Sequence, residues 1–256
     1  ASNIGLCAIA DAAKEMGYHN AISNASDIYS ANSFQPPMTI GTVQASPLTM
    51  ANVYATMGAN GVECTPIAIT KVTDRSGSKV KVPSANCHQA IDPDIAQTVS
   101  YALNQGVVQP GGEASTTQLD NNRKTFAKTG TNENTVMTTA GFVPNQVAAF
   151  VAVADAQDPI NNTFDNKTIN GMYIATPAWK QFMNTYLAAI NAPIDNDYGK
   201  GADKYTVSKG ATRTYNQYQY QRQQNSQQQS QQQTNQGQQQ QSQQQPAEQQ
   251  SDQQHQ

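Results

Sequence analysis

Apolar residues recur at helical spacing in four segments, which begin near residues 4, 46, 92 and 176. Three of these starts pair a small polar residue with proline: Ser46-Pro47, Asp92-Pro93 and Thr176-Pro177. The polar side chain can accept hydrogen bonds from a first helical turn, where proline is tolerated. The predicted inward faces are Leu6, Ile9, Ala13 and Met16; Met50, Val53, Tyr54 and Met57; Ile95, Val99, Ala102 and Leu103; and Trp179, Phe182, Met183, Tyr186 and Leu187.

Alternating and β-branched segments predict strands between these helices. The expected strands are 66–73 and 78–82, joined by a turn at 74–77; 138–143 and 147–154, joined by Pro144-Asn145-Gln146; and 125–129. Strands with helices before and after them, and with little strict βαβ alternation, favour an α+β fold with a mainly antiparallel sheet.

Composition divides the chain into three parts. Of the last 34 residues, 223–256, 21 are Gln, and such a segment has too little apolar surface to offset its ordering entropy. We expect a folded domain over residues 1–192, a linker over 193–222 and a disordered tail over 223–256. Inside the domain, residues 19–45 form a long polar loop, and loops of that length are usually functional.

Charge and targeting signals exclude several classes of function. The formal net charge is −3 with 13% charged residues, and no basic patch points to nucleic acid. No apolar run reaches the roughly 18 residues of a membrane span. The chain shows neither a signal peptide nor an initiator Met, so we expect a piece of a longer protein, with any membrane anchor in the missing N-terminal part.

The three cysteines, Cys7, Cys64 and Cys87, show no CxxC spacing, which argues against zinc. Cys64 and Cys87 flank the first predicted hairpin, so a disulfide between them is plausible in an oxidising compartment. The alternative is three buried thiols. No EF-hand or HExxH pattern is present, and we expect neither a metal nor a cofactor.

Nucleophile motifs are equally sparse. His19, His88 and His255 have no Ser or Cys partner by spacing, so a Ser-His-Asp triad has little support. A phosphate-binding loop is excluded because Ala127 and Asn122 stand where it requires glycine.

Lys128-Thr129-Gly130-Thr131 offers a more specific pattern at the end of the strand near residue 125. Lysine supplies positive charge, glycine allows a ligand to approach closely, and the two threonine hydroxyls share a face. This set suits an extended peptide that ends in a carboxylate. The alternative is a solvated strand end with a lysine that discourages strand pairing.

The surrounding sequence resembles a known family. FAKTGT resembles the Lys-Thr-Gly motif of penicillin-binding proteins and serine β-lactamases. The segments IADAAKEMGY, IGTVQASPLTMANVYATMGANGVECTPIAITKVTDRSG, KTGT, AGFVPNQVAAFVAVAD and TPAWKQFM follow in the order seen in class A penicillin-binding proteins. The contexts of Cys64 and Cys87 resemble actinobacterial members. The resemblance covers about residues 4–190 and identifies the C-terminal part of a transpeptidase domain.

The resemblance implies the α/β/α penicillin-recognising fold and D,D-transpeptidation of peptidoglycan stem peptides, with β-lactams acylating the same serine. Lys128 would place positive charge beside the substrate carboxylate, which the hydroxyls of Thr129 and Thr131 would bind. The Thr131 N–H would donate to the oxyanion, and Gly130 would permit close approach. The parent would be anchored on the extracytoplasmic side of the plasma membrane and carry a glycosyltransferase domain.

The departures from the family concern the nucleophile. Its Ser-x-x-Lys and Ser-x-Asn motifs lie upstream of the first helix, so we expect no nucleophile in this chain and no activity of the chain alone. Look-alikes start at Ser76, Ser78, Ser30 and Ser84 but match turn or loop positions. Thr138 stands where class A members usually carry Trp.

Two other functions stay open. One is a D,D-carboxypeptidase or β-lactamase-like hydrolase, which the class A order and the long loop oppose. The other is a non-catalytic module that binds wall peptide. We expect the Gln-rich tail to be a spacer on the wall side.

Overall fold

The computed structural model describes residues 4–19, 29, 34–132, 136–154, 163–164, 167–168 and 171–206. The chain divides into two compact units, Ala1–Asp203 and Lys204–Gln256. The second unit is described only for residues 204–206, so the expected tail at 223–256 lies outside the described residues.

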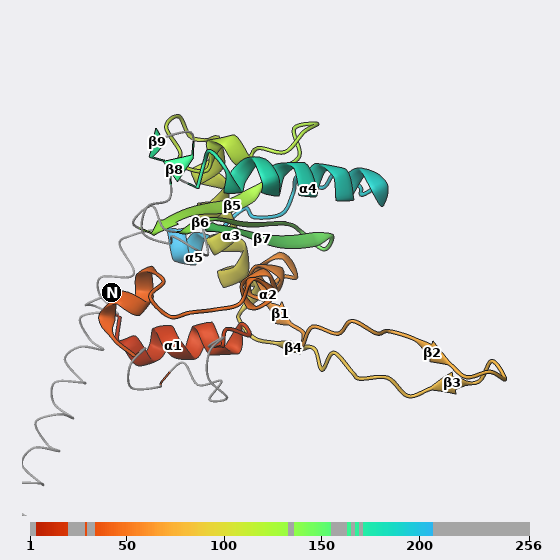
Figure 1. Cartoon of the computed structure of the whole chain (residues 1–256). Coiled ribbons are helices and arrows are strands. Elements are labelled where there is room, and N and C mark those ends of the chain that lie inside the picture. The colour runs from red at the N-terminus through yellow and green to blue at the C-terminus, as the bar shows by residue number, and fades with distance from the viewer. Residues whose placement is uncertain are drawn as a thin grey trace, which may run out of the picture. The chain divides into compact units, whose positions relative to one another are not determined.

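The described elements, labelled in Figure 1, follow one another along the chain as helices, short ribbons and a central sheet. They are α1 (Leu6–Glu15), η1 (Pro36–Ile40), α2 (Pro47–Gly58), β1 (Val62–Glu63), β2 (Val72–Thr73), β3 (Lys79–Val80), β4 (His88–Gln89), α3 (Pro93–Val108), η2 (Ser115–Thr117), β5 (Phe126–Asn132), β6 (Val136–Val143), β7 (Val147–Ala154), β8 (Thr163–Phe164), β9 (Lys167–Thr168), α4 (Ala175–Ala189) and α5 (Asp203–Thr206).

The main sheet has the strand order β5-β6-β7, and both pairs are antiparallel. Because β5 stands at the end of this order, it is an edge strand. Its register with β6 pairs Lys128 with Ala140 and Gly130 with Thr138. Asn145, at φ 56°, makes the tight turn between β6 and β7. The predicted α+β class with a mainly antiparallel sheet is confirmed.

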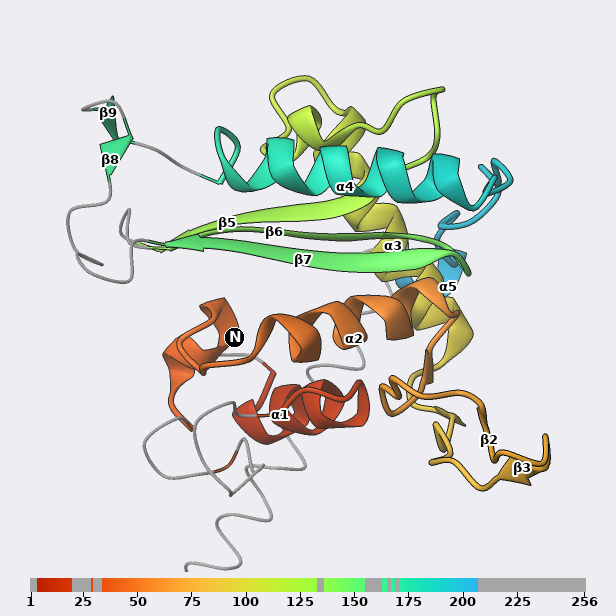
Figure 2. The same cartoon turned by 45° about the vertical axis from the view of Figure 1, so that its right-hand side comes forward.

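Helices cover both faces of this sheet (Figure 2). Helix α4 packs on β6 and β7 from one side, α2 packs on the same strands from the other side, and α3 packs against β5. The α2 start follows the predicted cap, because the Ser46 hydroxyl accepts the Thr49 N–H at 3.1 Å.

The core on the α4 side is built around Trp179, Met183 and Leu187. Trp179 is fully buried, and its Nε1 donates to the Ala149 carbonyl at 3.0 Å. Phe182 and Tyr186, predicted to face inward, are 48% and 39% exposed and stack on each other instead. That prediction was wrong because this part of α4 packs on the sheet through the i, i+4, i+8 row of Trp179, Met183 and Leu187, and Phe182 and Tyr186 lie beside that row.

The core on the α2 side joins residues far apart in the sequence. Phe126 and Phe142 stack with ring centroids 5.0 Å apart, and Met57 packs beside them. Tyr198 closes this cluster edge-on to both rings, and its hydroxyl donates to the Met57 carbonyl and accepts the Asn60 N–H at 3.1 Å. This side of the core therefore depends on a residue that follows α4.

Residues 192–202, which include the start of the expected linker, pack back on the sheet and α3. Arg123 donates to the carbonyls of Ala192 and Pro193 at 2.9 and 2.5 Å, and Gly199 N–H donates to Gln97 at 2.6 Å. The Lys124 ammonium donates to the Tyr198 carbonyl at 2.6 Å, and burial lowers the pKa of Lys124, with the nearby Lys200 charge adding to it. The first compact unit accordingly extends to Asp203.

Two helix predictions need correction. In α3, Ile95 and Val99 are exposed, whereas the buried side is formed by smaller residues one position later, Ala96 and Ser100. In α4, the helix begins at Ala175, so Thr176 lies inside its first turn and bonds the Thr139 hydroxyl at 2.9 Å rather than capping it. In both cases tertiary packing overrides the local pattern.

The first predicted hairpin is a two-stranded arm, residues 65–86, that projects from the sheet and helices (Figure 1). The strands observed in the arm are shorter than the predicted 66–73 and 78–82, because pairing is limited to β2 (Val72–Thr73) and β3 (Lys79–Val80). At its base a disulfide joins Cys64 to Cys87, and β1 pairs with β4. Cys7 is a free, exposed cysteine, so the alternative of three buried thiols is wrong.

The described residues provide neither a membrane-spanning helix nor a cluster of metal ligands. No helix there is long and apolar enough to cross a bilayer. No group of three or more His, Cys, Asp or Glu side chains there could hold a metal ion.

Candidate active site

Lys128, Thr129, Gly130 and Thr131 lie on β5 with one edge of the strand unpaired among the described residues. The strand is buried at its start, where Phe126 and Ala127 anchor it in the two cores, and it becomes accessible from Lys128 onward. The cores therefore fix the position of an exposed edge.

Side-chain alternation places these four residues on two faces of the sheet. Thr129 and Thr131 lie on the α4 face, since Thr129 pairs with Thr139 and that residue bonds Thr176 of α4. Lys128 and Gly130 lie on the opposite face. A ligand that runs along the free edge would thus meet the ammonium from one face and the hydroxyls from the other.

Lys128 already holds an anion. Its Nζ lies 3.4 Å from Oε2 of Glu113 and donates to the Thr129 carbonyl at 2.8 Å. The Glu113 side chain is 81% exposed, and exposed ion pairs contribute only about 0–1 kcal/mol. Another carboxylate can therefore replace Glu113 on Lys128 at small cost.

Glu113 was not among the site residues predicted from the sequence. It reaches Lys128 because α3 ends at Val108 and the chain turns sharply through Gly111 and Gly112. A Cβ at Gly112 would lie 2.2 Å from the Gly106 carbonyl oxygen, so the turn requires glycine. The Gly-Gly pair just before a lone acid was the available signal.

The hydroxyls differ in their present contacts. Thr131 accepts the Gly171 N–H at 3.1 Å, which leaves its own O–H free to donate to a ligand. Thr129 donates to the Glu113 carbonyl over a long 3.4 Å. Both hydroxyls can thus contribute a hydrogen bond to an incoming carboxylate.

Gly130 is held close to its cross-strand neighbour. A Cβ built on Gly130 would lie 2.3 Å from the Thr138 hydroxyl oxygen. Thr138 is the position at which the sequence departs from the class A pattern. In this chain the small glycine and the threonine fit each other across the strand pair.

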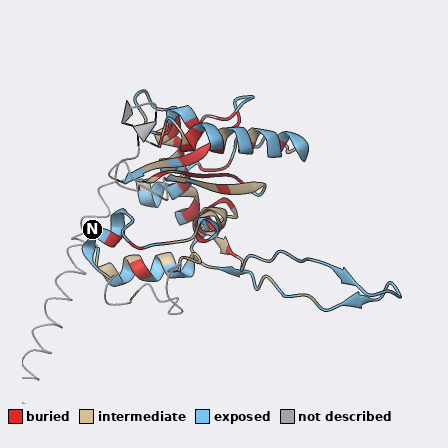
Figure 3. Cartoon of the chain, in the orientation of Figure 1, coloured by how far each residue is buried: buried red, intermediate tan, exposed pale blue. Residues whose placement is uncertain are grey.

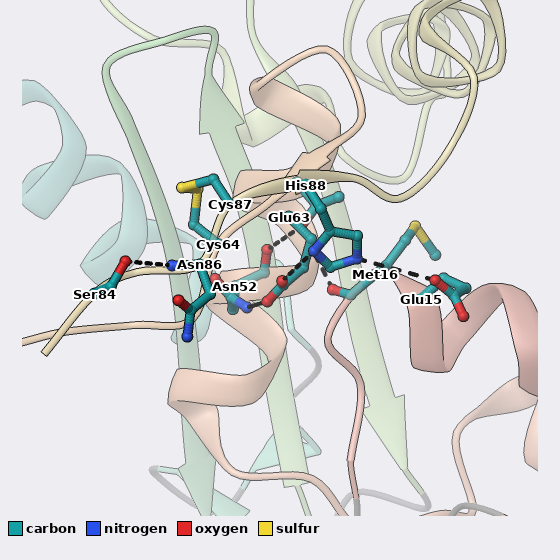
Figure 4. A network of polar contacts seen from close by, with 10 residues as sticks. Glu15, Met16, Asn52, Glu63, Cys64, Ser84, Asn86, Cys87 and His88 are labelled. Atoms are coloured by element: carbon teal, nitrogen blue, oxygen red, sulfur yellow. Dashed lines mark hydrogen bonds and ion pairs between the residues drawn. A yellow bond between two sulfur atoms is a disulfide. The ribbon is translucent and has the colours of Figure 1, made fainter.

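The nucleophile look-alikes among the described residues do not reach this edge. Ser76 and Ser78 lie in the exposed tip of the arm, where the Ser76 hydroxyl bonds Asp74 at 2.6 Å. Ser84 accepts the Asn86 N–H at 3.2 Å near the arm base (Figure 4). The look-alike that starts at Ser30 lies outside the described residues.

The two described histidines make structural contacts. His19 Nε2 lies 2.9 Å from the Thr49 hydroxyl at the start of α2. His88, on β4, lies 3.5 Å from Glu63 and 4.0 Å from Glu15, and Asn52 donates to Glu63 at 2.9 Å (Figure 4). This network joins the arm base to α1 and α2.

The chain is similar in sequence to penicillin-binding proteins. The family model for "Penicillin binding protein transpeptidase domain" matches residues 1–184. The chain is 26% identical over 190 residues to penicillin-binding protein 1A of Clostridium botulinum (strain Langeland / NCTC 10281 / Type F), an alignment that covers 68% of this chain and 22% of that protein. It is 29% identical over 157 residues to penicillin-binding protein 1A of Mycolicibacterium smegmatis, covering 57% and 19%.

A solved structure shares the fold. The PonA1 protein from Mycobacterium tuberculosis, in complex with penicillin V, matches with a TM-score of 0.65 at 21% identity, over 77% of this chain and 53% of that one. The chain spans about a fifth of the length of the curated relatives it matches, at 22% and 19%.

Proposed function

We propose, from the premise that this chain belongs to the penicillin-binding protein transpeptidase family, that it forms one wall of a peptidoglycan D,D-transpeptidase active site. In that reaction a serine Oγ attacks the amide carbonyl of D-Ala-D-Ala and the terminal D-Ala leaves. The acyl group then passes from serine to an amine of a neighbouring stem peptide. A β-lactam would acylate the same serine.

The residues of β5 would act as a recognition edge. Lys128 supplies the positive charge for the substrate carboxylate, and the hydroxyls of Thr129 and Thr131 donate to it. Gly130 keeps the edge open to the peptide. The Thr131 N–H would be one of the two donors to the oxyanion, and the N–H of the nucleophile would be the other.

The observation that carries the proposal is the Lys128–Glu113 contact on the free edge of β5. The Glu113 carboxylate oxygen lies 3.4 Å from the ammonium and its side chain is 81% exposed, which supports a site where another carboxylate can take its place. In the proposed reaction the terminal carboxylate of a stem peptide would take the place of Glu113 and make the same contact with Lys128.

We assign the nucleophile to a serine outside this chain, because the described look-alikes lie on the arm and not at the β5 edge. The parent would carry a glycosyltransferase domain and lie on the outer side of the plasma membrane. Alone, the chain would bind ligand weakly and would not turn over substrate.

A binding titration tests the recognition edge. Penicillin V, or a capped peptide that ends in D-Ala-D-Ala, is added to the chain while backbone amide signals are followed by NMR. We expect shifts centred on residues 128–131 and roughly tenfold weaker binding in Lys128→Gln. The matched control is Lys180→Gln on α4, which should bind as the wild type does. Shifts elsewhere, or equal affinity in Lys128→Gln, would refute the assignment.

A labelled penicillin tests the missing nucleophile separately. We expect no covalent adduct with the 256-residue chain. A stable adduct, mapped to a serine by mass spectrometry, would show that the nucleophile lies within this chain.

A further inference from the structure

The arm contains more strand-forming sequence than the chain itself pairs. Residues 66–73 read PIAITKVT, yet only Val72 and Thr73 join a ladder. In the described part of the chain, no backbone hydrogen bond links 66–71 with 81–84, and no third strand pairs with β2 or β3. Exposed strands with free N–H and C=O groups are templates for a further strand.

The arm is also the basic part of an acidic chain. Residues 65–86 contain four basic residues and one acidic residue, while the whole chain has a net charge of −3. Residues 68–81 are all exposed (Figure 3). None of the four cations, Lys71, Arg75, Lys79 and Lys81, forms an ion pair with the described residues.

The single acidic residue of the arm, Asp74, is occupied by the turn. Its Oδ1 accepts the Ser76 hydroxyl and the N–H groups of Ser76 and Ser78 at 2.6 to 2.9 Å. These hydrogen bonds, led by the Ser76 hydroxyl, lower the pKa of Asp74. The carboxylate therefore stabilises the tip and leaves the lysines unneutralised.

The two faces of the arm differ in chemistry. The register places Thr73 opposite Lys79 on one face and Val72 opposite Val80 on the other, with the valines 38% and 47% exposed. Alternation extends the first face to Lys71 and Lys81. A strand that alternates acidic and apolar side chains would complement both faces at once.

The arm is presented on a fixed base. The Cys64–Cys87 disulfide and the contacts of His88 with Glu63 and Glu15 tie its two ends to α1 and α2 (Figure 4). Such anchoring lowers the ordering cost of binding. The lysines also repel the arm of a second copy, so self-pairing is disfavoured while an acidic strand is attracted.

We propose that the arm is a docking site for an acidic polypeptide segment, which adds along its edge as a further β-strand. A polypeptide fits better than an anionic lipid surface, because only a polypeptide can satisfy the free backbone groups as well as the charges. The inference does not depend on the proposed acyl transfer.

The test uses the whole chain and a short capped peptide in which Glu and Val alternate. Affinity is measured by calorimetry, and protection of arm amides is measured by hydrogen exchange. Two variants each lose three positive charges. The arm variant is Lys71→Gln, Lys79→Gln and Lys81→Gln; the control variant is Lys14→Gln, Lys180→Gln and Lys200→Gln.

We expect the peptide to slow hydrogen exchange within residues 66–82 and to bind the arm variant about tenfold more weakly than the control variant. A version of the peptide N-methylated at alternate residues keeps the charges but loses the strand hydrogen bonds, and it should also bind about tenfold more weakly. Equal binding by both variants, or by both peptides, would overturn the proposal. So would vesicles of phosphatidylglycerol that displace the peptide from the arm.

Discussion

Replacing Tyr198 by phenylalanine removes one oxygen atom from the α2 side of the core. That oxygen donates to the Met57 carbonyl and accepts the Asn60 N–H, and Tyr198 is only 8% exposed. Two backbone groups at the end of α2 would lose their partner. A buried polar group left unsatisfied costs about 1–3 kcal/mol.

The thermal consequence follows from the size of the compact unit, Ala1–Asp203. At this size each kcal/mol lowers Tm by about 2–4 °C, so Tyr198→Phe should lower Tm by roughly 2–12 °C. Tyr198→Ala also removes the ring that packs edge-on to Phe126 and Phe142. Its cost should rise to about 3–5 kcal/mol.

Far-ultraviolet circular dichroism measures Tm in thermal melts and the free energy of unfolding in urea for both variants. The control is Tyr186→Phe on α4, where the side chain is 39% exposed and the change should stay within about 0.5 kcal/mol. If Tyr198→Phe and Tyr186→Phe unfold at the same urea concentration, then the segment after α4 does not stabilise the domain and the reasoning fails.

Three further predictions address other parts of the fold. Gly130→Ala should lower the free energy of urea unfolding by about 1–3 kcal/mol, because its Cβ would lie 2.3 Å from the Thr138 hydroxyl oxygen. Adding Thr138→Ala should recover most of that stability, and additive costs of the two mutations would contradict the contact. Replacing Cys64 and Cys87 by serine should cost up to about 3 kcal/mol by urea unfolding, given a sequence separation of 23, and the variant should no longer respond to a reducing agent. Burial raises the pKa of Tyr54 to about 12 in the folded state, against about 10 when unfolded, so its contribution to stability is full below pH 10 and falls by roughly 3 kcal/mol as the pH rises to 12. Tyr54→Phe should remove that part of the stability loss in a series of melts at alkaline pH, and an unchanged slope would argue against it.

The sequence predicted what depends on local signals. Ser46-Pro47 starts a helix, and Pro144-Asn145-Gln146 joins two strands, because caps and turns are set by a few neighbouring residues. The Lys128 edge was likewise visible as a pattern, and the family resemblance gave it a role.

Other features depend on contacts between distant residues. The buried face of α3 was misassigned because Ser100 looks like a surface residue. It is buried beside Gly199, where a Cβ added to the glycine would lie 3.3 Å from the Ser100 Cβ. The apolar periodicity of α3 does not indicate that the segment around Gly199, about 100 residues later, approaches so closely that only small side chains fit.

Trp179 gives the chain an internal spectroscopic reporter. It is the single tryptophan in the sequence, and it is fully buried where α4 meets β7. Its emission therefore describes one interface alone, with no background from other indoles. Separation of α4 from the sheet would shift that emission to the red, whereas fraying of the arm would leave it unchanged. Comparing fluorescence with circular dichroism would then reveal whether the two sides of the sheet melt together.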